Sequence, residues 1–554
     1  MKRLLSLTLF LMSIFCLFSI NSKQINASKI VFENFGVAKD CSLEEASEAI
    51  SESTLIQVLI KTKNEKFEFE SKDNYLNYSK YRKALKESAS KHFYNKNKLV
   101  FEKLGIGKYL DMFICKYMPY IELTFETKYF DDNAFELLSK ISNLFDIEIA
   151  YVNNISDKVK VEDYMISNFS YVGAYSIYEE REYTGSGIRV GLLESGIIDE
   201  DHQNIQNMNY VIRDELLFFE TETEHAIKTA SIIAGETGVA HDATIYSVQV
   251  FGNISGELDW LVENDVDIIN MSFGENGSEG TYSTMSAQVD FVSDTYGIVC
   301  VAAVGNDGTD DSLVGNPALG YNVISVGSCN IDDTLCGYTS IYEDVAPSKP
   351  TICALGDINI PNITPYVSGT SFSCAFISGF IAMMMEQYPV LRGNPPLCQA
   401  FITANSMFLT AYNDTYNCGL DEEVGVGAFN YANILDNDYY MFSKFIDTNR
   451  IGSTIWTHNV YITAGDKLQI SLCWSATTDG TVNGTERADF DIRLRGPNGL
   501  VYFMTSNQGC DSVLKFVRLL EAPVTGTYTI EIVQRENITH AVEDIYLAYS
   551  INAI

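Results

Sequence analysis

The sequence predicts an α/β protein whose largest domain is a doubly wound parallel sheet, preceded by a small α/β module and followed by an all-β, jelly-roll-like sandwich. Three observations predict this architecture. Nearly continuous apolar runs alternate with helical segments between residues 166 and 437, as in strands buried on both faces. Short alternating runs separated by turn signals replace them after residue 438. The 554 residues are also too many for a single core.

Composition and charge narrow the class of protein. A hydrophobic content of 46 % with 20 % charged residues is typical of a folded globular chain. The net charge of −35 argues against nucleic acid as a partner, because binding it would require a basic face. No later apolar stretch is long enough to cross a bilayer, so no membrane span is expected once the amino-terminal segment has been removed.

Residues 1–27 predict a secretory signal peptide, and therefore an extracellular protein. Lys2 and Arg3 form the charged start, and the apolar run Leu4–Ile20 follows. An uncleaved anchor is the alternative, although the run is short for a full span. Export would permit disulfides, and of the twelve cysteines we consider Cys329 and Cys336 a candidate local bridge.

Residues 28–165 predict a small α/β module. Tyr120–Phe125 alternates like a strand, Asp132–Phe145 has helical spacing, and Ile147–Val152 alternates again. We interpret these three segments as a β-α-β unit.

Five apolar runs between residues 166 and 437 predict the buried strands of the parallel sheet. Active sites in such sheets lie beyond the carboxyl ends of the strands, so polar residues at those ends are candidates for chemistry. The runs are Ile188–Leu193, Thr244–Val250, Val266–Met271, Ile298–Val304 and Val323–Val326.

Four polar residues stand where acyl-transfer chemistry would need them. Ser371 precedes a buried apolar helix, where backbone N–H groups and the helix dipole favour a developing negative charge; a simple N-cap is the alternative. Glu194 ends the first strand and could accept a hydrogen bond from a histidine such as His225, which opens a helix of small residues. Asn306 ends another strand and could donate its amide to an oxyanion, although asparagine before a glycine turn is also common.

Together these segments resemble the subtilisin-like serine proteases (subtilases) over roughly residues 166–437. The chain order acid, histidine, serine is the order that this family uses. The resemblance is carried by Gly185–Gly196, the helix that His225 opens, Gly238–Ala243, Asp267–Gly274, Ala303–Asn306, Gly369–Ser371 and the late segment Gly425–Asn430.

The resemblance implies a serine endopeptidase that acts on polypeptides through an acyl-enzyme intermediate. Ser371 would attack the peptide carbonyl, His225 would pass the proton to the leaving amine, and Glu194 would orient the imidazole. Asn306 and the backbone N–H of Ser371 would stabilise the oxyanion. Extended substrate would bind as an added strand along Ser272, Phe273, Gly274, Ala303 and Gly305.

The sequence departs from the family pattern at three places. The family has aspartate where Glu194 stands, and the extra methylene requires a shift on the order of 1 Å. Asp199 or Asp201, in the loop beyond the strand, is the alternative acid. The other departures flank the histidine and the serine: Ala226 and Ile227 replace a glycine and a threonine, and Ala375 and Phe376 replace a proline and a histidine.

The resemblance also implies roles for the flanking segments. Residues 28–165 match a pro-region that acts as chaperone and intramolecular inhibitor, with a retained accessory domain as the alternative. Self-cleavage would fall within residues 154–183. Residues 438–554 are similar to the β-domains that follow subtilase catalytic domains, and we favour a stabilising role for them over surface binding.

Two further points concern cofactors and alternative functions. The chemistry requires no cofactor; calcium is common in the family, but the acidic loops at residues 199–201 and 307–311 yield no ligand set. A catalytically weak or inactive subtilase fold that binds peptides is the alternative, supported by Glu194 and the altered flank of His225. A lipase is excluded because Ser371 lacks the Gly-x-Ser-x-Gly elbow.

Overall fold

The computed structural model of the chain divides into two units, Met1–Val159 with Val250–Asp265, and Lys160–Gln249 with Val266–Ile554. The structure describes residues 30–34, 37–38, 55–63, 67–70, 72, 78–106, 109, 111–126, 144, 146–154, 183–213, 223–250, 252–274, 280–308, 313–330, 334–341, 348–360, 364–407, 409, 420–430, 434, 438–446, 450–505, 512–535 and 543–552. The predicted signal peptide lies outside these residues, and so does the predicted self-cleavage segment except for Asn154 and Tyr183.

The first unit contains a six-stranded sheet. Its first strand pairs in parallel with the last, and the other pairs are antiparallel. Two strands coincide with the runs predicted at Tyr120–Phe125 and Ile147–Val152, whereas the predicted helix at Asp132–Phe145 lies, apart from Leu144, outside the described residues. The strand order is β2 (Val37–Ala38), β1 (Ile30–Asn34), β6 (Ile147–Asn154), β3 (Leu55–Thr62), β5 (Tyr120–Glu126) and β4 (Asp111–Ile114).

A long helix, α3 (Tyr78–Leu104), packs against this sheet, and the sequence analysis did not predict it. Straight-chain residues such as lysine and glutamate dominate it and favour helix. Asn97 ties the helix to the sheet, because its amide nitrogen donates to the carbonyls of Cys115 and Met118, each at 2.8 Å, while its amide oxygen accepts from the Thr62 hydroxyl at 2.6 Å.

Helix α6 (Ser255–Glu263) belongs to the same unit, although it comes from the middle of the chain. At its start, the Ser255 hydroxyl donates to Glu122 of β5 at 2.6 Å. In its middle, the buried Asp259 carboxylate accepts the backbone N–H groups of Tyr117 and Lys116 at 2.7 and 3.0 Å. Burial raises the pKa of Asp259 to about 7, although these two hydrogen bonds act in the opposite direction.

Basic side chains bind the carboxyl end of α6. Arg82 donates to the carbonyl of Asp265 at 2.6 Å, and Lys86 donates to the carbonyl of Glu263 at 2.9 Å. Lys116 also forms an ion pair with the Glu263 carboxylate at 2.6 Å. Cations at a helix carboxyl end complement its dipole, so charge as well as shape holds α6 in this unit.

The second unit is built on a seven-stranded sheet in which every described pair is parallel, which confirms the predicted parallel sheet. All five predicted strands are present; β8 and β13 are additional. The order is β13 (Ile352–Leu355), β12 (Val323–Cys329), β11 (Val299–Ala303), β10 (Ile268–Met271), β7 (Arg189–Glu194), β9 (Thr244–Gln249) and β8 (Asn209–Ile212).

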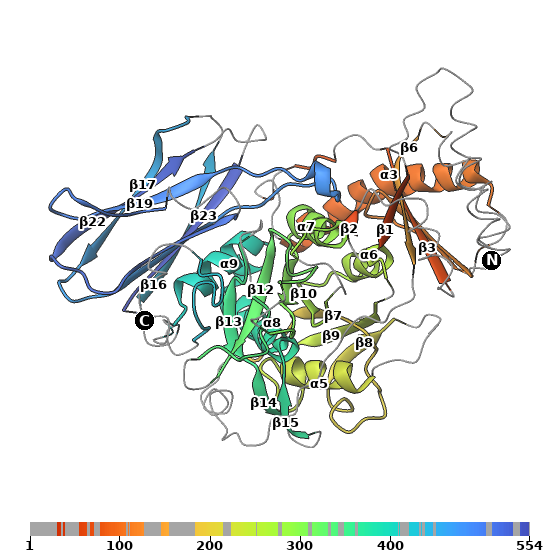
Figure 1. The fold of residues 1–554 in the computed structure, drawn as a ribbon, viewed down its shortest axis with the longest axis horizontal. Helices are drawn as coiled ribbons and strands as arrows, with labels where there is room; N and C mark the ends of the chain where they lie inside the picture. Colours follow the sequence, from red (N-terminus) through yellow and green to blue (C-terminus); the bar gives the residue numbers. More distant parts are fainter. Residues whose placement is uncertain are drawn as a thin grey trace. The chain divides into compact units, whose positions relative to one another are not determined.

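Helices α5 (Thr223–Ala234), α8 (Thr370–Gln387) and α9 (Pro395–Ala404) share one apolar core with the sheet (Figure 1). Nearly every residue of α8 is buried, so its sequence is apolar all round rather than amphipathic. Helix α7 (Thr284–Tyr296) packs against β11 and β12. A two-stranded antiparallel ribbon, β14 (Asp357–Ile360) and β15 (Thr364–Ser368), leads into α8.

The strand order reverses at β7. This first strand of the sheet pairs with β9 on one side and with β10 on the other, and later strands extend outward from both. Such a switch point opens a crevice at the carboxyl ends of the strands, where ligands bind in open α/β sheets. Glu194 is the last residue of β7 and therefore lies at the switch point.

The carboxyl-terminal residues form a sandwich of two antiparallel four-stranded sheets, as the alternating runs predict. The alternating runs at residues 457–463, 467–474, 490–495, 500–505, 528–533 and 544–551 each coincide with a strand, whereas β16 and β21 were not predicted. One sheet contains β16 (Asp438–Ile446), β23 (Glu543–Ile551), β18 (Leu468–Cys473) and β21 (Leu514–Leu519); the other contains β17 (Thr454–Ile462), β22 (Gly526–Gln534), β19 (Phe490–Arg495) and β20 (Val501–Met504).

Strands β18 and β21 of the first sheet are buried on both faces. One face fills the sandwich interior, and the other packs on α9 and contributes Cys473, Leu514 and Phe516 to the core of the parallel-sheet domain. Polar side chains also cross this contact. Gln469 donates to the carbonyl of Ser406 at 2.8 Å. The sandwich is therefore continuous with the preceding domain rather than attached to it by a linker alone.

Arg518 of β21 is fully buried at this contact. Its guanidinium donates to Gln469 at 2.6 Å, to the Ser406 hydroxyl at 3.0 Å and to the carbonyl of Val426 at 2.7 Å, and it lies 4.8 Å from the ring centroid of Phe516. A buried charge without such hydrogen bonds would destabilise the fold. The guanidinium therefore favours one arrangement of the segments that carry Gln469, Ser406 and Val426.

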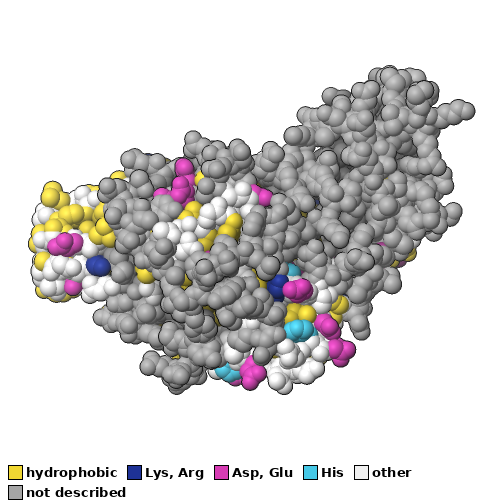
Figure 2. Space-filling model, turned by 60° about the horizontal axis from the view of Figure 1, so that its bottom comes forward, with side chains coloured by type: hydrophobic (Ala, Val, Ile, Leu, Met, Phe, Trp, Pro, Cys, Tyr) yellow, Lys and Arg dark blue, Asp and Glu magenta, His cyan; other side chains and the backbone are white. Residues whose placement is uncertain are grey.

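The sandwich also exposes hydrophobic side chains (Figure 2), among which Tyr461 and Leu500 are 67 % and 62 % accessible. Exposed apolar residues are common on folded proteins, and we assign no partner to this surface.

The cysteines that the structure describes are all buried free thiols. The predicted bridge between Cys329 and Cys336 is therefore wrong; the Cys336 thiol instead donates to the Asn330 side chain at 3.3 Å. Among the described residues, no helix has the length and apolar character that a membrane span requires.

We predict that Arg518→Ala lowers the free energy of unfolding of the second unit by about 3 kcal/mol, because it removes buried hydrogen bonds to the Gln469 side chain and to the Val426 carbonyl, which keeps only its longer bond from the Ser406 hydroxyl. Urea unfolding followed by tryptophan fluorescence would measure the change. The control is Arg495→Ala, which removes a part-exposed ion pair with Glu531 and should cost about 1 kcal/mol or less. Equal losses in the two variants would contradict the prediction.

Candidate active site

Three segments that are far apart in the chain position the predicted catalytic residues. Glu194 ends β7, His225 lies in the first turn of α5, and Ser371 lies in the first turn of α8. Helix α8 can begin where it does because Gly369 precedes it with a φ of +154°, a conformation that side-chain-bearing residues rarely adopt.

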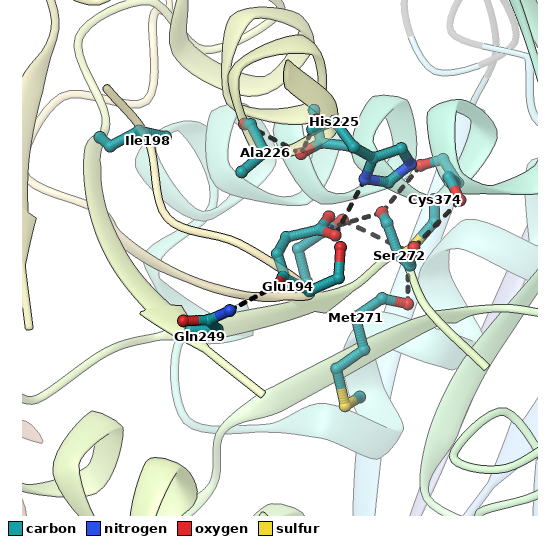
Figure 3. Close-up of polar contacts among 12 residues, drawn as sticks. Glu194, Ile198, His225, Ala226, Gln249, Met271, Ser272 and Cys374 are labelled. Atoms are coloured by element: carbon teal, nitrogen blue, oxygen red, sulfur yellow. Dashed lines mark hydrogen bonds and ion pairs between the residues drawn. The ribbon is translucent and has the colours of Figure 1, made fainter. Parts of the chain in front are cut away.

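The Glu194 carboxylate binds the imidazole of His225. Oε2 of Glu194 lies 3.0 Å from Nδ1 of His225, and the two side chains are 0 % and 3 % accessible (Figure 3). An ionised carboxylate only accepts hydrogen bonds, so Nδ1 carries a proton and Nε2 is the basic nitrogen of the neutral ring. Burial strengthens this bond, because water does not screen it.

The alternative acids Asp199 and Asp201 lie in the loop after β7, and both are exposed. The Asp199 carboxylate accepts the backbone N–H of Asp201 at 3.0 Å, as in a local turn. Among the carboxylates that the structure describes, Glu194 is the one hydrogen-bonded to His225.

Ser371 lies beside the end of β10. Its hydroxyl donates to the backbone carbonyl of Ser272 at 3.0 Å, and the Ser272 hydroxyl donates to the backbone carbonyl of Ser371 at 2.9 Å. The ring of the next residue, Phe372, packs 5.6 Å from the His225 ring, centroid to centroid. The first turn of α8, which carries Ser371, therefore contacts both the residue after β10 and the ring of His225.

Asn306 is oriented by Thr370. Its amide oxygen accepts the backbone N–H of Thr370 at 2.8 Å and the Thr370 hydroxyl at 2.9 Å. Because a backbone N–H can only donate, the oxygen must face Thr370, and the amide nitrogen is directed away from it. Such a nitrogen can serve as an oxyanion donor.

No catalytic or binding role was predicted for Thr370, although the residue lies in the Gly369–Ser371 motif. Gly305, which directly precedes Asn306, has a φ of +116°. A Cβ at this residue would lie 2.7 Å from Oγ of Ser340, so the position requires glycine. The turn that carries Asn306 is therefore held by Thr370 at the Asn306 amide and by the close approach of Ser340 to Gly305.

The residues predicted to bind substrate lie at the ends of two adjacent strands. Ser272, Phe273 and Gly274 directly follow β10, while Ala303 is the last residue of β11 and Gly305 follows it. Since β10 and β11 pair in parallel register, these segments lie at the same edge of the sheet. Phe273 is buried, so its ring contributes to packing.

No group of three histidine, cysteine, aspartate or glutamate side chains able to bind a metal ion occurs among the described residues. The exposed loop at residues 199–201 supplies no such group.

Residues 185–427 match the model of the subtilase family. Subtilisin NAT from Bacillus subtilis subsp. natto is 27 % identical over 284 residues, which cover 47 % of this chain and 70 % of that protein. Subtilisin from Bacillus pumilus is 28 % identical over 225 residues, 37 % of this chain and 80 % of that one. The minor extracellular protease Epr from Bacillus subtilis (strain 168) is 26 % identical over 276 residues, 46 % of this chain and 40 % of its own length.

Two solved structures are similar in fold. Fervidolysin from Fervidobacterium pennivorans, a keratinolytic enzyme, covers 91 % of this chain and 81 % of its own, with 15 % identity and a TM-score of 0.49. The prenylagaramide maturation protease PagA covers 48 % of this chain and 98 % of its own, with 22 % identity and a TM-score of 0.39. Both TM-scores are below 0.5, so neither likeness decides the fold or the function of this chain.

We predict that Glu194→Gln slows the labelling of Ser371 by a fluorophosphonate about 10⁴-fold, because an amide permits the wrong imidazole tautomer. Glu194→Asp keeps the charge but withdraws the carboxylate from its 3.0 Å contact, so a loss of about 10- to 100-fold is expected. The labelling rate of the purified protein measures both effects.

The matched control is Asp199→Asn, which removes a neighbouring carboxylate from the exposed loop and should leave the rate unchanged. A large loss in Asp199→Asn with little loss in Glu194→Gln would show that the loop aspartate is the catalytic acid.

Proposed function

We propose that this chain is a secreted serine endopeptidase that hydrolyses peptide bonds through Ser371, His225 and Glu194, because residues 185–427 match the model of the subtilase family. The observation that carries the proposal is the buried hydrogen bond between Glu194 and His225, at the sheet edge that also bears the first turn of α8. Ser-His-Glu combinations are chemically competent, because glutamate offers the same charge and acceptor atoms as aspartate.

In the proposed mechanism, Nε2 of His225 accepts the Ser371 proton as Oγ attacks the peptide carbonyl. Glu194 stabilises the resulting imidazolium through Nδ1, and His225 then protonates the leaving amine. The Asn306 amide and the Ser371 backbone N–H stabilise the oxyanion, in a site where burial strengthens each hydrogen bond. In the second half of the reaction, His225 accepts a proton from water as the water attacks the acyl-enzyme. His225 then returns a proton to Oγ of Ser371, and the product acid is released.

The substrate lies extended along Ser272–Gly274 and the end of β11, adding a strand to the edge that they form. The hydroxyl of Ser371 donates to the Ser272 carbonyl in the absence of substrate, so it must rotate toward His225 before attack. A substrate N–H that takes over the Ser272 carbonyl would favour this rotation, since it competes for the same acceptor.

Residues 28–165 act in this proposal as a pro-region that inhibits the enzyme within the same chain. Its contacts with α6 support the role, because α6 lies inside the residues that match the subtilase model. Extracellular location is supported by the signal-like start of the sequence and by the extracellular relative from Bacillus subtilis.

We expect purified precursor to cleave itself, whereas Ser371→Ala accumulates uncut because it lacks the nucleophile. Mass spectrometry of the two preparations over time measures the cleavage and locates the new amino terminus. Ser453→Ala, at an exposed serine of the carboxyl-terminal sandwich, should process like the wild type. An uncut wild type that also resists fluorophosphonate would favour the alternative, an inactive fold that binds peptides.

The pH dependence of the pro-region complex follows from Asp259. Its pKa of about 7 in the assembled unit exceeds the usual value, which an exposed Asp259 recovers when the pro-region leaves. The complex therefore holds a proton that the separated parts release, so association weakens as pH rises from about 4 to about 7 and levels off above that.

We predict that the cleaved complex dissociates on the order of ten-fold more readily at pH 7.5 than at pH 5, measured by the release of peptidase activity. Asp259→Asn cannot titrate and should lose most of this difference. Lys116 and Glu263 carry the other charges nearest to Asp259 and are present in both proteins. An unchanged pH dependence in Asp259→Asn would contradict the assignment.

A further inference from the structure

A buried chain of hydrogen bonds lies behind Ser371. The amide nitrogen of Asn270, in β10, donates to the hydroxyl of Ser272 at 2.8 Å, and this hydroxyl donates to the backbone carbonyl of Ser371 at 2.9 Å. The side chains of Asn270 and Ser272 are fully buried. An asparagine inside a buried apolar strand needs such partners, since an unbonded amide there would destabilise the fold.

Two donors on α8 fix the orientation of the Asn270 amide. Its oxygen accepts the Ser378 hydroxyl at 2.9 Å and the Cys374 thiol at 3.3 Å. Burial raises the pKa of the Cys374 thiol, and the charge of Glu194 raises it further, so the thiol stays protonated and remains a donor. The amide oxygen therefore faces α8, and the amide nitrogen faces Ser272.

This orientation fixes the direction of the remaining bonds. The Ser272 hydroxyl has one proton, and it accepts from Asn270, so its own proton is directed to the Ser371 carbonyl. The hydroxyl of Ser371 donates in return to the Ser272 carbonyl at 3.0 Å. Each serine thus binds the backbone of the other. When the Ser371 hydroxyl rotates toward His225, the bond from the Ser272 hydroxyl remains as the clip between the first turn of α8 and the residue after β10.

The clip joins the two groups whose separation matters most for catalysis. Ser371 carries the nucleophile, and the backbone of Ser272 begins the segment proposed to bind extended substrate. A fixed separation between them keeps a bound peptide carbonyl within reach of Oγ, and misplacement by about 1 Å can cost about 100-fold in rate.

We propose that the side chains of Asn270 and Ser272 are positioning residues, which hold Ser371 at a fixed offset from the substrate-binding strand through the hydroxyl of Ser272. The inference rests on the proposed function and adds residues that act through Ser371 rather than on the substrate.

The test is Asn270→Asp, which keeps the shape of the side chain but places an acceptor where the amide nitrogen donates. In this variant the Ser272 hydroxyl donates to the new carboxylate and no longer to the Ser371 carbonyl. We expect kcat for a peptide substrate to fall about 10- to 100-fold with KM within about two-fold of the wild type. Ser272→Ala should show the same kinetic change, and the double variant should be no slower than either single one.

The matched control is Ser378→Ala, which removes one bond to Asn270 but leaves the Cys374 thiol on its oxygen and the bond to Ser272 intact. Its kcat should stay within about two-fold of the wild type. Thermal unfolding of all variants, with titration of reactive Ser371 by a fluorophosphonate, separates lost rate from lost folded protein.

The outcomes distinguish the two proposals. An active wild type whose kcat is unchanged in Ser272→Ala and Asn270→Asp would overturn the positioning role alone. A fall in kcat that Ser378→Ala shares, in proportion to lost thermal stability, would also overturn it, because the chain would then act only on folding. A wild type without hydrolysis or labelling would overturn the proposed function, and this inference with it.

Discussion

The hydrogen bond between Glu194 and His225 is the interaction on which the site depends. It exists because β7 is the strand where the sheet order reverses, so that its last side chain lies at the carboxyl edge of the sheet at this switch point. A carboxylate buried there without a partner would be costly, and the imidazole is its partner. The extra methylene of glutamate is accommodated at normal hydrogen-bond distance, with no shift to another acid.

The serine side of the site is organised by backbone groups more than by charges. Thr370 turns the Asn306 amide, Gly305 allows the chain to make that turn, and the first residues of α8 present their N–H groups at the same edge. The electrostatic environment is therefore fixed before any ligand binds, which is the condition under which hydrogen-bond donors stabilise a developing charge most effectively. In this respect the helix start and the strand ends form one rigid frame.

Strands that are buried on both faces could be predicted from the sequence more readily than partly exposed strands and helices. The central strands were predictable because their apolar runs are unbroken, whereas β8 is half exposed and β21 carries the buried cations Lys515 and Arg518, which interrupt its pattern. Helix α3 was missed because two of its buried positions, Arg82 and Asn97, are polar. The order of acid, histidine and serine could be recognised from motifs, but the orientation of an amide such as Asn306 or Asn270 depends on partners that no local pattern contains.

The burial of β18 and β21 on both faces has a consequence for any attempt to shorten this chain. A cut near residue 437 would expose the apolar side of α9 on the first fragment. On the second fragment it would expose Cys473, Leu514 and Phe516 to solvent. Neither fragment would therefore be suitable, without redesign, as a domain for fusion or domain exchange. A minimal version would need a newly designed polar surface along α9, together with a substitute for the guanidinium that holds the Val426 carbonyl.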